Sequence, residues 1–183
     1  MEPVVTRRRW AWGLLVAWLA LVAGINWAVP LQHAPLIFSS AAREHVSPWM
    51  VAAVIRTESG FRPDVVSQRG AVGLMQVLPG TAGWIRGRTG IHGALTNPAT
   101  NIALGTWYLS YLLGRYQDDA TLALAAYNGG PHVVDDWLKT GVLTPQSPAA
   151  AIPYSETRVF VTRVLWLQRA YGTVYAGLAH RPR

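Results

Sequence analysis

Cysteine is absent from this chain of 183 residues, so neither a disulfide framework nor a thiolate metal site can form. Lysine occurs only once, as Lys139, and the basic side chains are therefore almost entirely arginine. Charged residues make up only 14% of the chain, whereas hydrophobic residues make up 51%. A chain of this length and composition is too apolar to be disordered, and we expect one substantial core in one folded domain.

Several common site patterns are also missing. None of the 5 histidines forms a pair at helical ligand spacing with a glutamate in between, which argues against a zinc hydrolase. The sequence contains no Asp-rich calcium loop, no glycine-rich phosphate cradle and no serine flanked as in Gly-x-Ser-x-Gly. We therefore expect no bound metal and no organic cofactor.

The formal net charge is +7, from 16 basic and 9 acidic residues. Without Arg7, Arg8, Arg9 and Glu2, the remainder has 13 basic and 8 acidic residues and carries a net charge of +5. A moderately basic body suits polyanions in general, which include DNA and the acidic polymers and peptide carboxylates of a bacterial wall. Charge alone does not choose between these partners.

Residues 10–29 form an uncharged run dominated by Leu, Val, Ala and Trp. About 20 apolar residues in a helix suffice to cross a bilayer, so we expect a transmembrane anchor. The arginines before it should keep residues 1–9 in the cytoplasm and send the rest of the chain across the membrane. Trp10, Trp12 and Trp27 lie near the two ends of the run, where indoles prefer the interface.

A removable signal peptide is the alternative, with cleavage near the small residues Ala23 and Gly24. We favour the single-pass anchor because the apolar run is long and continues past that weak site to Val29. Both interpretations export the rest of the chain.

The chain after the apolar run is predicted to be all-α, because short helical patterns alternate with strong breakers and no sustained period-two alternation occurs. Most of the expected helices start at a capping residue, at a proline or at both. They cover residues 49–59, 74–83, 98–116, 119–128, 131–140 and 154–171. Pro79 can start a second helix within 74–83, and Asp118 or Asp119 caps the helix that ends at Asn128. Residues 176–183 are expected to be a flexible tail.

Glu58 is the best candidate for a chemically active group. It lies at the end of a predicted helix whose preceding turns, from Met50 to Ile55, are apolar, so we expect its side chain to be half-buried. Burial raises the pKa of a carboxyl, and such an acid can stay protonated near neutral pH and protonate a leaving oxygen. The alternative is an ordinary helix-terminal residue paired with Arg56 or Arg62, and position alone does not decide between the two.

Four blocks of the sequence occur in an order that is typical of one family. The blocks are Val54–Phe61, Gly70–Pro79, Ala125–Pro131 and Ile152–Arg158. With them the chain resembles, over residues 34–171, the soluble-type lytic transglycosylases (SLT domain), which are relatives of goose-type lysozyme. The resemblance implies a compact lysozyme-like helical domain with an active-site cleft, and we assign it to residues 34–175.

The resemblance also implies which residues form the site. Glu58 matches the family's catalytic glutamate. The positions that would bind substrate are matched by Ser67, Met75, Gln76, Tyr127, Asn128 and Glu156. The Gln76 amide could serve an N-acetyl group or a sugar hydroxyl, and Tyr127 could contact the developing oxocarbenium region or Glu58.

Three of these positions have equally simple structural explanations. Ser67 could be a turn residue, and Asn128 could serve as a helix C-terminal residue. Glu156 is expected near the start of the last helix, where the dipole favours a carboxylate and where Arg158 or Arg163 could pair with it. We therefore expect Glu156 to hold the cleft rather than to attack the sugar.

Two residues depart from the family's usual pattern. Leu78 stands where methionine is common, a volume-conserving change that should keep a wall of the cleft. Phe160 stands where tyrosine is frequent, so any polar contact of that hydroxyl is lost.

Acidic residues are scarce, and a mechanism with a single carboxylate fits them better than one with two. As the resemblance implies, Glu58 would protonate the oxygen that joins MurNAc to GlcNAc and would then take the proton of the C6 hydroxyl, which leaves a 1,6-anhydro-MurNAc end. The expected partner is peptidoglycan, with the membrane reached through the anchor, no nucleic acid and a monomeric catalytic domain.

Three alternatives remain open at this point. A muramidase of similar fold would use water, with Asp64 as the first candidate to position it. The chain could also be a non-catalytic peptidoglycan-binding component of the envelope, given its basic and Trp-rich body. DNA binding would require a cytoplasmic body, which the arginines before the apolar run argue against.

Overall fold

The computed structural model describes residues 29–176 and the isolated positions 12, 14, 16 and 24. The chain divides into two compact units, residues 1–31 and residues 32–183, and the helical domain below belongs to the second. The predicted anchor at residues 10–29 lies almost wholly outside the described residues, as does the tail from residue 177. Within the described residues, no helix has both the length and the apolar character needed to span a bilayer.

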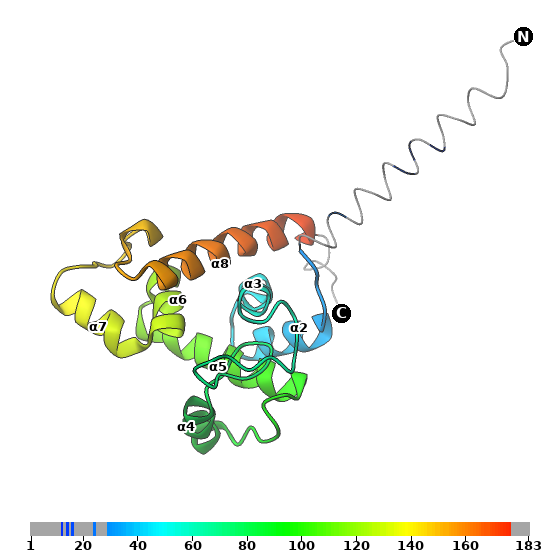
Figure 1. Ribbon diagram of the computed structural model, residues 1–183, viewed down its shortest axis with the longest axis horizontal. Helices are drawn as coiled ribbons and strands as arrows, with labels where there is room; N and C mark the ends of the chain where they lie inside the picture. Colours follow the sequence, from blue (N-terminus) through cyan, green and yellow to red (C-terminus); the bar gives the residue numbers. More distant parts are fainter. Residues whose placement is uncertain (1–11, 13, 15, 17–23, 25–28, 177–183) are drawn as a thin grey trace, which may run out of the picture. The chain divides into compact units, whose positions relative to one another are not determined.

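The second unit is built from helices, which confirms the predicted all-α class (Figure 1). In chain order the elements are α2 (Ala34–Arg43), α3 (Pro48–Glu58), α4 (Pro79–Thr89), α5 (Pro98–Arg115), α6 (Ala120–Gly129), α7 (Pro131–Lys139), the 3-10 turn η1 (Ala149–Ala151) and α8 (Ser155–Val174). The part of the chain that is described contains no strand, only two isolated antiparallel bridges, and both involve Val72.

The helix starts follow the capping and proline signals of the sequence. Proline occupies the first turn of α3, α4, α5 and α7. The Asn97 side chain accepts a hydrogen bond from the Thr100 N–H at 3.1 Å, and Asp119 accepts one from the Leu122 N–H at 3.0 Å. Ser47 precedes α3 as predicted, although its side chain makes no capping hydrogen bond. These local signals confirm the predicted starts of α3, α5, α6 and α7.

Helix α3 lies at the centre of the core. Its residues from Met50 to Ile55 are all buried, so every face of the helix is covered by other elements. It packs against α8 and α2, and Figure 1 shows it end-on near the middle of the helices. Because α3 is buried along its length, the residue at its C-terminal end, Glu58, is carried out of the core to the edge of the packed region.

Residues 74–78 were predicted to start a helix, and this prediction is wrong. They belong to a loop, bridged from Val72 to Val66 and Val77, and α4 begins only at Pro79 and continues to Thr89. Leu74 and Met75 are neighbouring apolar residues, which is why the segment looked like the buried side of a helix. Both side chains are indeed fully buried, but in a loop. Contacts with other elements bury them, and local periodicity does not reveal such tertiary contacts.

Helix α8 also extends beyond its predicted end. It continues through Gly172 to Val174, whereas glycine was expected to stop it. A Cβ atom on Gly172 would lie 3.7 Å from the Trp49 ring of α3, an ordinary contact distance. Packing along α3 therefore keeps this last turn helical despite the low helix propensity of glycine.

Candidate active site

An open hollow of about 400 Å³ lies at the C-terminal end of α3. Its lining combines two carboxyl groups, three amides, a hydroxyl, a guanidinium, a phenol ring and an exposed apolar side chain. It is lined by Glu58, Ser67, Gln68, Arg69, Ala71, Gln76, Leu78, Tyr127, Asn128 and Glu156. The structure thus brings together every predicted site residue except Met75.

The Glu58 side chain is half-buried, as its position in the sequence predicts. Burial, and after it the nearby negative charge of Glu156, together raise the pKa of Glu58 from 4.5 to about 8. The carboxyl is therefore protonated at neutral pH. In the described part of the chain Glu58 joins no ion pair, and the Arg62 Nε donates to the Ser59 carbonyl at 3.1 Å. These observations support the protonated acid over the helix-terminal ion pair.

Tyr127 comes from α6 and lies close enough to Glu58 to sense its charge. Its hydroxyl donates to the Met75 carbonyl at 2.8 Å. Burial raises the pKa of Tyr127 well above its usual range, and the charge of Glu58 and the neighbouring Tyr108 act in the same direction. The phenol thus stays protonated, and its ring forms a fixed wall beside the carboxyl.

Met75, which was predicted to bind substrate, is absent from the lining of the hollow. The side chain is fully buried, beside Gly105 and Thr106 of α5. Its backbone supports the site, because the Met75 N–H donates to Asn101 Oδ1 at 2.7 Å and its carbonyl accepts from Tyr127. Met75 therefore positions the loop that carries the neighbouring Gln76.

Gln76 lies in a turn with a φ of 48°, and not in a helix as predicted. Its Nε2 donates to the carbonyls of Val65 at 3.0 Å and Gly73 at 2.9 Å. Both amide hydrogens are thus used within the loop, and the Oε1 atom is left as an acceptor. Gln76 can accept a hydrogen bond from an acetamido N–H or a sugar hydroxyl in a fixed direction.

Ser67 closes a turn and also lines the hollow. Its Oγ accepts from the Ala71 N–H at 3.0 Å, and its backbone N–H donates to the Ala71 carbonyl at 2.9 Å, so it closes a turn. It also lines the hollow. Because the oxygen accepts within the turn, the hydroxyl hydrogen remains available for a ligand.

Asn128 lines the hollow from inside α6, which ends one residue later. Its Oδ1 accepts from the Thr157 hydroxyl of α8 at 2.8 Å. The helix is ended by Gly130, with a φ of 91°, so Asn128 does not serve as the cap. This contact fixes the amide of Asn128 and joins α6 to α8 beneath the site.

Glu156 lies in the first turn of α8, as predicted, but its partner is Arg69 rather than Arg158 or Arg163. The closest atoms of the pair are 3.4 Å apart, and both side chains are largely exposed, so the contact adds little stability. Arg158 instead donates to the Ile152 carbonyl at 2.7 Å. Glu156 is the only carboxylate besides Glu58 that lines this hollow, and its charge favours the protonated form of Glu58.

The sequence reasoning missed three residues of the lining: Gln68, Arg69 and Ala71. All three adjoin Ser67 in the turn, and the Ser67–Ala71 spacing was the signal that could have found them. Leu78 is 43% exposed and forms the expected apolar wall. Among the described residues, no group of three or more His, Cys, Asp or Glu side chains is placed to hold a metal ion.

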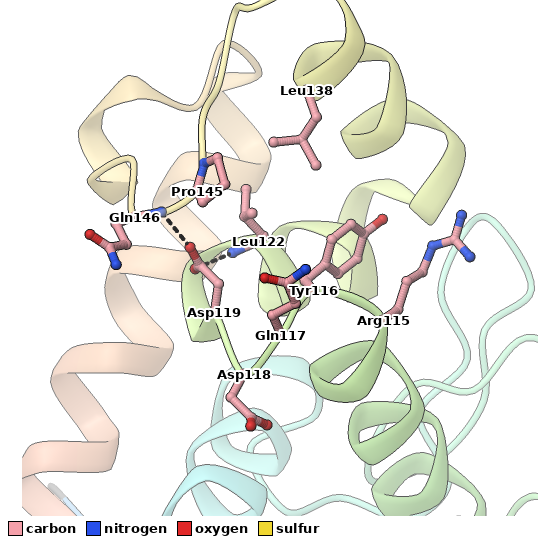
Figure 2. A pocket seen from close by; sticks show the side chains of 9 residues that line it. All are labelled: Arg115, Tyr116, Gln117, Asp118, Asp119, Leu122, Leu138, Pro145 and Gln146. Carbon is pink, nitrogen blue, oxygen red and sulfur yellow. Dashed lines mark hydrogen bonds between the residues drawn. The ribbon is translucent and has the colours of Figure 1, made fainter.

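Another hollow, of about 410 Å³, lies where α5 turns into α6, and Figure 2 shows the side chains that line it. Asp119 is one of its acidic residues and has a structural role. The Asp119 carboxylate accepts hydrogen bonds from the N–H groups of Leu122 at 3.0 Å and Gln146 at 2.7 Å. The Asp119 carboxylate thus caps a helix and fastens a loop. Of these two hollows, the one at Glu58 contains a carboxyl whose pKa is raised to about 8.

Comparison with known proteins agrees with this geometry. The chain belongs to the transglycosylase SLT domain family, whose model matches residues 35–142. It is 36% identical over 176 residues to the soluble lytic murein transglycosylase of Salmonella typhimurium, a match that covers 90% of this chain and 26% of that relative. It is 32% identical over 166 residues to membrane-bound lytic murein transglycosylase C of Yersinia pestis, which covers 76% of this chain and 46% of the relative.

The crystal structure of the 70 kDa soluble lytic transglycosylase from Escherichia coli superposes with a TM-score of 0.75 at 33% identity. The match covers 85% of this chain and 26% of that structure. This likeness confirms the predicted lysozyme-like helical fold. The chain spans about a quarter of the length of the soluble relatives, so the likeness concerns one domain of larger proteins.

Proposed function

We propose that this chain is a peptidoglycan lytic transglycosylase that cleaves the β-1,4 bond between MurNAc and GlcNAc. The observation that carries the proposal is the half-buried Glu58, whose pKa of about 8 keeps it protonated in an open hollow lined by amides and hydroxyls. The two relatives described above are named lytic murein transglycosylases, and the soluble lytic transglycosylase of known structure shares the fold.

In the first step Glu58 acts as the acid. Its proton passes to the bridging oxygen while the bond from C1 of MurNAc to that oxygen breaks, and GlcNAc leaves with a free hydroxyl. The substrate's own N-acetyl group stabilises C1, and the Gln76 Oε1 is placed to hold an acetamido N–H or a sugar hydroxyl. Charge that develops at the sugar is faced by the ring of Tyr127, which lines the same hollow.

In the second step the same carboxylate acts as the base. Glu58 takes the proton of the C6 hydroxyl, and O6 closes onto C1 to give a 1,6-anhydro-MurNAc end. No water is consumed, and Glu58 returns to its protonated state. The intramolecular attack gains from proximity, since O6 and C1 belong to the same sugar residue.

The placement of the other carboxylates favours this single-acid scheme. Asp64, the candidate for positioning water in a muramidase, is exposed and does not line the hollow. Glu156 lines it but is paired with Arg69. Asp64 is therefore not placed to position a water molecule at Glu58, which supports closure by O6 over attack by water.

We further propose that residues 10–29 anchor the protein in the cell membrane, with residues 1–9 in the cytoplasm and the helical domain facing the wall. The support comes from the uncharged run, the arginines before it and the existence of a relative named as membrane-bound. A cytoplasmic body that binds DNA would not meet such a substrate.

The test of the catalytic assignment is the Glu58→Gln substitution, which keeps the shape of the side chain and removes its proton transfer. Release of soluble glycan from purified sacculi should fall by at least about a hundredfold, in the range for loss of a general acid. Asp64→Asn provides a matched control on an exposed carboxylate and should release glycan at the unaltered rate. A Glu58→Gln protein as active as the parent would refute the assignment and favour a non-catalytic wall-binding component.

A further inference from the structure

Arg69 is the one basic residue among those that line the active-site hollow. Its side chain is 75% exposed, and its Nη2 lies 3.4 Å from Glu156 Oε2. Apart from Glu156, the other groups of the lining are neutral at pH 7, since Glu58 keeps its proton. An anionic group that enters this hollow therefore meets a single cation.

Backbone contacts, and not the ion pair, hold Arg69 in position. Arg69 lies in a turn that begins at Ser67, and the Gly70 N–H donates to the Ser67 carbonyl at 2.9 Å. The Ala71 N–H donates to the Ser67 Oγ at 3.0 Å. Gly70 has a φ of 76°, which a residue with a side chain rarely adopts. The turn is thus closed without any contact of the Arg69 guanidinium.

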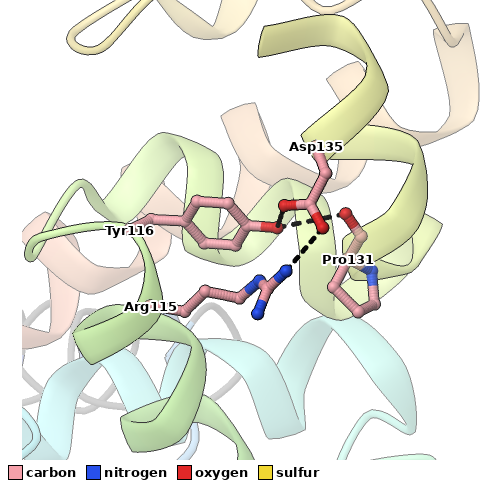
Figure 3. Close-up of polar contacts among 4 residues, drawn as sticks. All are labelled: Arg115, Tyr116, Pro131 and Asp135. Carbon is pink, nitrogen blue, oxygen red and sulfur yellow. Dashed lines mark hydrogen bonds and ion pairs between the residues drawn. The ribbon is translucent and has the colours of Figure 1, made fainter. Parts of the chain in front are cut away.

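A comparison with Arg115 shows how loosely the Arg69 side chain is held. Arg115 and Asp135 form the other ion pair of the described residues, with Nη2 and Oδ2 2.6 Å apart, and the Tyr116 hydroxyl donates to Asp135 Oδ1 at 3.0 Å (Figure 3). These two side chains are 40% and 35% exposed, against 75% and 69% for Arg69 and Glu156. The Arg115 pair is a fixed structural contact, whereas the longer and more solvated Arg69 pair adds little stability and costs little to open.

The Arg69 guanidinium has more donors than its ion pair uses. Arginine carries five N–H donors in one plane, and among the described residues Arg69 has one hydrogen-bond partner, the Glu156 carboxylate at Nη2. The planar donors match the two oxygens of a carboxylate. A carboxylate of a ligand can therefore bind to Arg69 beside Glu156 or in its place.

We propose that Arg69 binds a carboxylate of the substrate, carried by the lactyl group of MurNAc or by the peptide stem attached to that group. This inference rests on the proposed function, because it takes the glycan cleaved at Glu58 as the ligand. The lactyl carboxylate is free where no stem is attached, and a stem carries carboxylates of its own. Arg69 is thus a specificity-determining residue, which favours glycan with these anionic groups over a neutral glycan with the same sugar backbone.

Glu156 should have the opposite effect on the same ligand. Its carboxylate competes for Arg69 and repels a second negative charge nearby. Loss of the Arg69 charge should therefore weaken the binding of an anionic glycan, and loss of the Glu156 charge should strengthen it. If the pair only fastened the turn to α8, both losses would act in the same direction. The direction of the two effects thus separates binding from fastening.

The test measures glycan affinity in the whole chain carrying Glu58→Gln, so that binding is read without cleavage. Isothermal titration compares three peptidoglycan glycans of equal length: one with stems, one without stems and with free lactyl carboxylates, and one without stems whose lactyl carboxylates are amidated. We expect Arg69→Gln to lower the affinity ratio of an anionic over the amidated glycan by about fivefold, the upper range for an exposed charge pair. Arg69→Lys, which keeps the charge, should recover part of this ratio.

Glu156→Gln should raise the same ratio. Arg163→Gln is the matched control and should leave the ratio unchanged, since it removes one positive charge from an exposed position on α8 outside the hollow. The anionic glycan whose ratio falls in Arg69→Gln identifies the source of the carboxylate, either the lactyl group or the stem.

The inference would be overturned if Arg69→Gln left both ratios unchanged, or if Arg69→Gln and Glu156→Gln shifted them in the same direction. Failure of the unaltered chain to cleave sacculi is a separate result. If the ratio still fell in Arg69→Gln, that failure would contradict the proposed chemistry and leave the carboxylate site standing.

Discussion

Two effects raise the pKa of Glu58, burial and the charge of Glu156, and a substitution can separate them. Burial at the end of α3 is the larger cause of the raised pKa, and the charge of Glu156 is the second. Burial belongs to the fold and cannot be removed without damage. The charge of Glu156 can be removed, because that side chain is exposed and its ion pair with Arg69 adds little stability.

Glu156→Gln should therefore lower the pKa of Glu58. An acid must be protonated to act, so kcat/KM falls as pH rises through its pKa, about 8 in the unaltered protein. With Glu156 neutral, the ionised form of Glu58 is less disfavoured, and this alkaline limb should move to lower pH. The measurement is the pH profile of kcat/KM for glycan cleavage, with Asp64→Asn as the control that leaves the limb in place.

If the alkaline limb of the kcat/KM profile does not move to lower pH in Glu156→Gln, the charge of Glu156 does not raise the pKa of Glu58. Glu156 would then act only through contacts with the glycan. Reading the position of the limb rather than the rate separates the electrostatic effect from a loss of binding. Glu156 lines the hollow, so its substitution is also expected to change KM.

At the scale of elements, the loop of residues 65–78 shows why the site is ordered. Three hydrogen bonds hold it: Ser59, directly after α3, donates to the Leu74 carbonyl at 2.8 Å, Asn101 of α5 accepts from the Met75 N–H, and Tyr127 of α6 donates to the Met75 carbonyl. Asn101 Nδ2 donates in addition to the Val72 and Leu95 carbonyls. Gln76 is thus placed by the core and not by a helix of its own.

Gly105→Ala tests this support. A Cβ atom at Gly105 would lie 2.5 Å from the Met75 sulfur and 2.6 Å from its Cβ, so Met75 must shift, and Tyr127 and Gln76 with it. We expect a loss of stability of about 1–3 kcal/mol, typical of overpacking, and a clear rise in KM. Chemical denaturation and glycan cleavage kinetics check the two effects.

Gly114→Ala is the matched control on the same helix, because nothing lies within 4 Å of a Cβ at that position. It should stabilise the protein by about 0.5–1 kcal/mol, the usual gain for alanine over glycine in a helix. Equal effects of the two substitutions would show that the contact between Met75 and Gly105 does not position the site.

The helix starts could be predicted from the sequence, but the loop could not. Caps and prolines act within one turn, so Asn97, Asp119 and Pro131 predicted the starts of α5, α6 and α7 correctly. Leu74 and Met75 follow a helical pattern but are buried by other elements, and the partner of Glu156 comes from the distant Arg69. Such contacts join segments far apart in the chain, which periodicity cannot reveal.

At the scale of the whole molecule, a single buried helix determines where the chemistry occurs. Helix α3 is covered on every face, so its C-terminal residue emerges at the boundary between core and solvent. There the Glu58 carboxyl is buried enough to keep its proton at neutral pH, and it still lines an open hollow that a polymer can enter. The family likeness supports the fold, and this boundary position explains the acid.

In the proposed reaction, Glu58 gives a proton and then regains one while O6 closes onto C1 of the same sugar. This closure can be measured by mass spectrometry of the fragments that the unaltered chain releases from purified sacculi. We expect MurNAc ends that are lighter by one water than reducing ends, as 1,6-anhydro closure requires. Reducing MurNAc ends that carry the additional water would contradict it and identify the protein as a hydrolytic muramidase.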